Sequence, residues 1–174
     1  PEQRLPLLSG LNEKAMAADK RITKVNVSLA DSAGAILVAD SHGRIVEDLQ
    51  PMTTLGLSCV AEQGGRRETS GYNVAGRAGL EFYTSERLDR VVREAVARTT
   101  ILFEAVPAPA GEMPVVLAAG SSGILLHEAI GHGMEADFNR KNVSIYADKI
   151  GKRVAPPYVS IVDDATVEGA RGAI

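Results

Sequence analysis

The sequence predicts an α+β fold, in which an antiparallel β-meander is covered by an amphipathic helix and followed by a truncated second unit. Two observations lead to this prediction: apolar residues alternate with a period of two up to about residue 72, and recur with helical spacing over residues 84–106. A third observation, a proline- and glycine-containing stretch at residues 107–111, predicts a division into a unit at 1–110 and a second unit at 111–174.

The first unit is expected to contain four or five strands with short links after a helix at residues 11–20. Residues 22–29 alternate in polarity, and Asp31 to Gly34 has the composition of a turn, so a second strand is expected at 35–39. Another turn is expected at residues 40–43, before the segment at residues 44–47. Pro51 restarts the chain before a strand with Thr53, Leu55, Leu57 and Cys59 on one face, and Gly64-Gly65 reverses the chain into residues 66–72. Strands joined by such short links predict an antiparallel meander, and one face of that sheet is expected to be covered.

The covering helix is predicted from its apolar stripe. The stripe recurs at i, i+3, i+4 and i+7 and consists of Leu88, Val91, Val92, Ala95, Val96, Thr99, Leu102 and Phe103. Thr84 or Ser85 would cap its first turn. In the second unit we expect a buried strand at 114–119, a helix at 124–135 and a strand at 159–162. Because the chain starts at Pro1 and stops soon after that strand, we expect a piece of a longer protein with part of the second core missing.

Composition argues against several functional classes. The formal net charge is -3 and the pI is about 5.7, which gives no basic face for direct contact with nucleic acid. No apolar run approaches the roughly 18 residues of a membrane helix. The single cysteine, Cys59, cannot form an internal disulfide and fits a reducing compartment. We expect it to be buried as a small apolar residue.

The residues that suggest chemistry are His127, Glu128 and His132, in the pattern HExxxH. Imidazole nitrogens are good zinc ligands, and an adjacent carboxylate can act as a general base toward a metal-activated water. On a straight α-helix residues five apart lie about 140° from each other, so both rings could not face one ion. We therefore expect either a π-bulge or a break near Gly131. A histidine pair also arises by chance, without any metal.

Residues 123–138, from Gly123 through the motif to Phe138, resemble the signature of the TldD/PmbA metallopeptidase family. The resemblance extends back through residues 77–82 and forward to 162–164. It implies a cytoplasmic zinc peptidase that cleaves unfolded peptides and peptide precursors. It also implies that His127 and His132 bind zinc and that Glu128 is the catalytic base. The family's further ligand is a downstream Cys, which no residue here matches.

Some questions stay open at this point. Glu135 and Asp137 are candidates for orienting a histidine ring from outside the ligand set, or are merely solvated. The resemblance implies a metal-free paralogous partner subunit, with a homo-oligomer as the other possibility. Because a ligand is missing, we expect the 174-residue chain to be inactive by itself. The alternative function is a non-catalytic binding or assembly module.

Overall fold

The computed structural model describes residues 4–120 and 122–173, which divide into two compact units. One unit contains the residues up to Pro107 together with those from Asp164 onward, and the other runs from Ala108 to Asp163. The elements of the first unit are α1 (Leu5–Ala18), β1 (Ile22–Ala39), β2 (Ile45–Gln63), β3 (Arg66–Gly76), η1 (Leu80–Phe82), α2 (Ser85–Thr100) and η2 (Ile101–Glu104). The α+β class and the antiparallel meander are confirmed.

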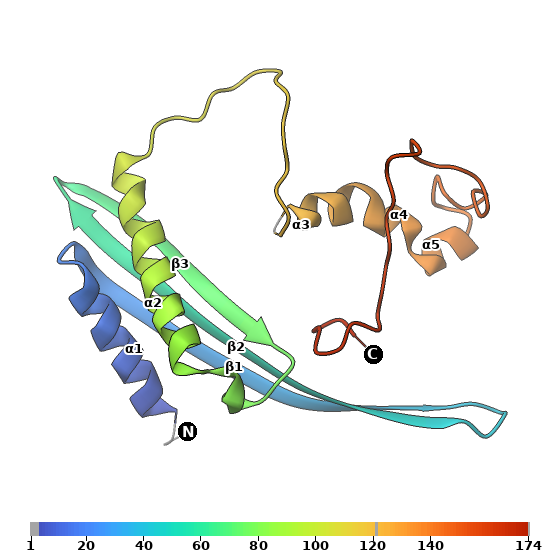
Figure 1. The fold of residues 1–174 in the computed structure, drawn as a ribbon, viewed down its shortest axis with the longest axis horizontal. Coiled ribbons are helices and arrows are strands. Elements are labelled where there is room, and N and C mark those ends of the chain that lie inside the picture. The colour runs from blue at the N-terminus through green and yellow to red at the C-terminus, as the bar shows by residue number, and fades with distance from the viewer. Residues whose placement is uncertain (1–3, 121, 174) are drawn as a thin grey trace. The chain divides into compact units, whose positions relative to one another are not determined.

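The sheet has three strands, in the order β1-β2-β3, rather than the expected four or five (Figure 1). The turn expected at residues 31–34 is wrong: Asp31 pairs with Thr53 and Gly34 with Gln50, in an unbroken ladder. Cross-strand hydrogen bonds satisfy this backbone better than an isolated turn would. Pro51 does not interrupt β2, because the pairing with β3 stops at Thr53. The part of β2 that precedes Thr53 is paired only with β1. A proline is tolerated there, because its nitrogen, which carries no hydrogen, can face the unpaired edge of the strand.

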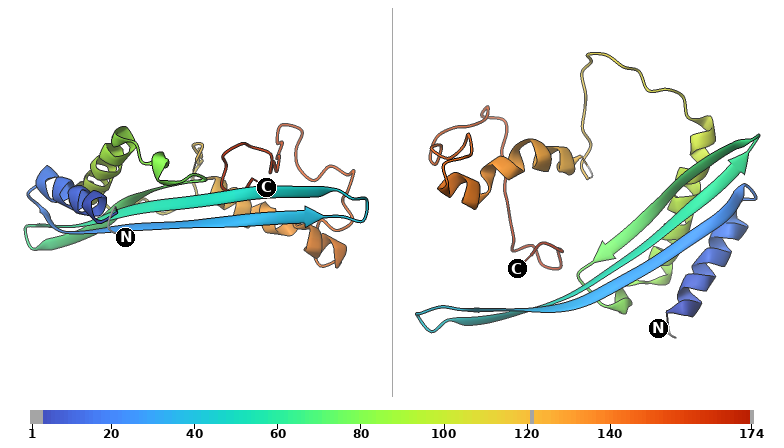
Figure 2. Two further views of the ribbon diagram at one scale, coloured as in Figure 1. Left: turned by 90° about the horizontal axis from the view of Figure 1, so that it is seen from below. Right: turned by 180° about the vertical axis from the view of Figure 1, so that it is seen from behind.

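Helices α1 and α2 lie side by side on one face of the sheet (Figure 2), which confirms the expected cover. The core between them contains the β2 residues predicted to share a face: Thr53, Leu55, Leu57 and Cys59 are each at most 2% exposed. Val91, Val92, Ala95, Val96 and Thr99 of α2 are also buried. Alternation on the strand and helical spacing on α2 therefore meet in a single apolar layer.

The helix ends differ in part from expectation. Thr84 caps α2, because its side chain accepts a hydrogen bond from the Arg87 backbone N–H. The α-helix ends at Thr100, and the rest of the predicted stretch continues as the 3₁₀ turn η2. Helix α1 begins six residues earlier than the predicted 11–20, with Pro6 in its first turn. A proline is favourable there, since the first helical N–H groups have no intrahelical partner.

The second unit is mostly helical turns and irregular chain. Its elements are α3 (Gly123–Leu126), the π-helical η3 (His127–Gly131), α4 (His132–Met134) and α5 (Ala136–Arg140). The strands expected at 114–119 and 159–162 are wrong, since neither segment is extended in a sheet. Val115, Val116 and Leu117 are 57–96% exposed. A strand needs a partner for its backbone groups, and the described residues of this unit provide none. Within residues 4–120 and 122–173, no helix combines the length and the apolar composition that a membrane-spanning segment requires.

Candidate metal centre

The HExxxH motif lies on a helix that changes its winding at the motif. Helix α3 passes directly into the π-helical η3, which begins at His127, and then into α4, which begins at His132. The backbone N–H of His132 donates to the carbonyl oxygen of His127, an i→i+5 bond that closes the π turn. Of the two expected alternatives, the π-bulge is the one that forms. Side chains five residues apart therefore lie on the same side of this turn, as side chains four residues apart do in an α-helix.

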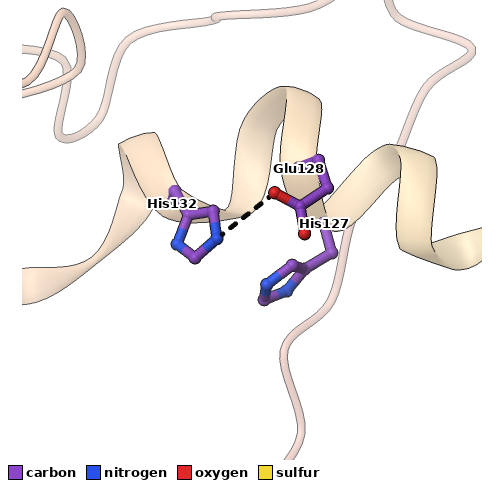
Figure 3. A group of neighbouring side chains, drawn as sticks. All are labelled: His127, Glu128 and His132. Atoms are coloured by element: carbon purple, nitrogen blue, oxygen red, sulfur yellow. Dashed lines mark ion pairs between the residues drawn. The ribbon is translucent and has the colours of Figure 1, made fainter.

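The π turn brings the two histidine rings to the same side of the helix (Figure 3). Their centroids are 4.5 Å apart, with the ring planes at 70°. A nitrogen of each ring and a carboxylate oxygen of Glu128 all lie within 4.8 Å of one another. All three residues are exposed, so their side chains can adjust and a ligand can reach them.

His132 has a carboxylate at each ring nitrogen. Glu135 Oε1 lies 2.6 Å from Nδ1, and Glu128 Oε2 lies 3.5 Å from Nε2. The hydrogen bond to Glu135, with a smaller contribution from the charges of both carboxylates, raises the pKa of His132 above its ordinary value. Glu135 therefore contacts the His132 ring directly. Asp137 does not: its carboxylate pairs with Lys141 at 3.2 Å.

A polar frame behind the motif was not foreseen from the sequence. Asn139 Nδ2 donates to the carbonyl oxygens of Glu135 (2.8 Å) and Gly133 (3.2 Å), and the Ser144 hydroxyl also donates to the Gly133 carbonyl. The Tyr146 ring lies against Gly133, where a Cβ would come within 2.9 Å of Cε2. The signal available was chemical: Asn and Ser commonly bond the free carbonyls at a helix end.

The donor set fits a zinc ion in chemistry. Two imidazole nitrogens belong to the common zinc ligands, and a tetrahedral ion with Zn–N bonds of about 2.1 Å places neighbouring ligand atoms about 3.4 Å apart. In the structure a nitrogen of each ring and a Glu128 carboxylate oxygen lie within 4.8 Å of one another. Cys59 is not available as a further ligand, because it is fully buried in the sheet core of the other unit. Its expected role as a buried apolar residue is confirmed, and burial raises the pKa of its thiol.

Two family models match the chain and together span most of it. The PmbA/TldA metallopeptidase central domain matches residues 1–103, and the C-terminal domain of the same family matches residues 110–174. Among curated proteins, a metalloprotease TldD homologue of Haemophilus influenzae is 41% identical over 99% of this chain and 37% of its own length. A TldD homologue of Buchnera aphidicola is 37% identical over the same shares. A metalloprotease of Methanocaldococcus jannaschii is 35% identical over 88% of this chain and 34% of its own.

The chain spans little more than a third of the length of these relatives. The match to the central-domain model covers more than half of the chain, and the second model continues through the HExxxH helix. The chain therefore belongs to the TldD/PmbA family of metallopeptidases.

Proposed function

We propose that this chain supplies two metal-binding histidines and the general base of a zinc-dependent peptidase. The observation that carries the proposal is the π turn, which gathers His127, Glu128 and His132 into one group within 4.8 Å. A straight α-helix would direct the two rings apart. Extra-residue turns of this kind concentrate at functional sites. The names of the relatives, which are metalloproteases, support the same assignment.

Each residue has a distinct role in this proposal. His127 and His132 offer neutral imidazole nitrogens to the ion. A bound zinc supplies Lewis acidity, which polarises a peptide carbonyl and lowers the pKa of a water molecule toward neutrality. Glu128, whose side chain is 63% exposed and whose carboxylate lies beside His132, accepts the proton of the attacking water and returns it to the leaving amine. Zinc enzymes of this type use three protein ligands, so a third ligand from outside these residues completes the set.

The substrate in this proposal is an unfolded or extended peptide, including peptide precursors. The exposure of the motif supports it, because all three side chains lie open on the helix surface, where an extended backbone can approach. A metal-free paralogous subunit, or a second copy of the same protein, is the proposed partner, and the cytoplasm is the proposed location. These three statements rest on the family resemblance.

The test uses the complete gene product with two substitutions and one control. Glu128→Gln should lower peptidase activity about 10²–10⁴-fold while the zinc content stays near wild type, because a general base is lost and no ligand is removed. His127→Ala should lower both the peptidase activity and the zinc content. Asp137→Asn, whose carboxylate pairs with Lys141, is the matched control and should change neither.

Activity of Glu128→Gln within a few-fold of wild type would refute the assignment of the base. A wild-type protein that binds zinc through His127 and His132 but cleaves no unfolded peptide would support the alternative of a non-catalytic binding module. Measurements of metal content by elemental analysis and of cleavage with a denatured protein substrate separate these outcomes.

A further inference from the structure

We infer that Glu135 is a positioning residue of the metal centre, which fixes the tautomer and orientation of His132 and is itself held in place by Asn139 and Ser144. This inference rests on the proposed function, because it assumes that His132 binds the metal. It adds the reason why the ring presents Nε2 rather than Nδ1 toward Glu128.

The first step is the geometry at His132. Its Nδ1 lies 2.6 Å from Glu135 Oε1, so the hydrogen of a neutral ring resides on Nδ1 and points to the carboxylate. The lone pair is then on Nε2, the nitrogen that faces Glu128 at 3.5 Å. Metal-binding histidines usually donate their other N–H to a carboxylate or carbonyl in this way, which orients the ring and makes it a better ligand.

The second step is why Glu135 can reach back to His132. The helix stops at Glu135, whose ψ of 135° is extended, and α5 begins at the following residue. This break is braced by side chains from later in the chain: Asn139 bonds the carbonyls of Gly133 and Glu135, and the Ser144 hydroxyl bonds the Gly133 carbonyl. Ser144 Oγ also accepts from the Tyr146 backbone N–H at 3.0 Å. The frame therefore fixes the backbone that carries Glu135.

The third step is that stability alone does not account for this pair. The side chains of His132 and Glu135 are 52% and 45% exposed, and ion pairs this exposed add little to the free energy of folding. Asp137, two residues further along the chain, contacts Lys141 instead. What distinguishes Glu135 is its placement on Nδ1.

The experiment compares Glu135→Ala, Glu135→Gln and the control Asp137→Asn in the complete gene product. The first readout is the His132 tautomer in metal-depleted, ¹⁵N-histidine-labelled protein at alkaline pH, where the ring is neutral; a His132→Gln sample assigns the resonance. Wild type and Asp137→Asn should show hydrogen on Nδ1. Glu135→Ala should shift toward the Nε2–H form that free histidine favours, and Glu135→Gln should retain the Nδ1–H form, because its amide oxygen still accepts.

The second readout is zinc affinity by chelator competition. Removing such a partner typically lowers metal affinity or activity about 10–100-fold, and we expect a loss in this range for Glu135→Ala and a smaller one for Glu135→Gln. Ser144→Ala should produce a mixture of tautomers with an intermediate affinity. An unchanged tautomer in Glu135→Ala, or an affinity within twofold of wild type, would overturn the inference. Zinc binding by wild type that is insensitive to His132→Gln would instead overturn the proposed function.

Discussion

A part-buried hydrogen bond between Thr53 and Tyr83 offers a quantitative test of how the sheet and its helical cover are joined. Thr53 is 1% exposed, and its Oγ1 lies 2.6 Å from the Tyr83 hydroxyl, just before α2 begins. Tyr83→Phe removes one partner and leaves the buried Thr53 hydroxyl without it. That situation costs about 1–3 kcal/mol. For a chain of this size each kcal/mol lowers Tm by about 2–4 °C.

The double variant gives the sharper result. Thr53→Val with Tyr83→Phe replaces both polar groups by apolar ones of similar shape, which is often nearly neutral. We therefore expect the double variant to be more stable than Tyr83→Phe alone, with a coupling energy of at least about 0.5 kcal/mol. Urea denaturation of the 174-residue chain followed by circular dichroism measures it. Additive effects, or a Tyr83→Phe variant as stable as wild type, would show that this hydrogen bond does not stabilise the fold.

Three further predictions concern acid stability, thiol reactivity and metal content. Hydrogen bonds from Arg21 lower the pKa of Asp19 to about 2, so the stabilisation is complete above about pH 4 and is lost as the pH falls through 2. Asp19→Asn should therefore cost about 1–2 kcal/mol at neutral pH and nothing in strong acid; a difference that persists at pH 1.5 would contradict this assignment. Cys59, fully buried, should react with a thiol reagent at least about 100-fold more slowly in the native chain than in urea, and equal rates would mean that the core opens freely. After dialysis the 174-residue chain should hold far less than one zinc by elemental analysis, because two histidines lack the usual third ligand, whereas one tightly held zinc would reveal a further ligand within the chain.

Much of the first unit could be predicted from local pattern. Alternation placed Leu55, Leu57 and Cys59 on one face, and the helical stripe placed Val91 and Ala95 against them, because the periods of strand and helix are properties of the backbone itself. The number of strands could not be predicted in the same way. Asp31 to Gly34 has turn composition, but its partners lie about 20 residues away in β2, and those pairings decide its conformation.

The candidate site shows the same division. The sequence by itself determined the identity and spacing of His127, Glu128 and His132, and the five-residue spacing required a departure from the α-helix. The choice of a π turn over a break, and of Glu135 over Asp137 as the partner of His132, came only with the folded chain. The reason is that Asn139 and Ser144 bond the backbone carbonyls at the end of the helix, from up to eleven residues downstream of Gly133. These hydrogen bonds set where the helix ends and therefore which carboxylate reaches the His132 ring.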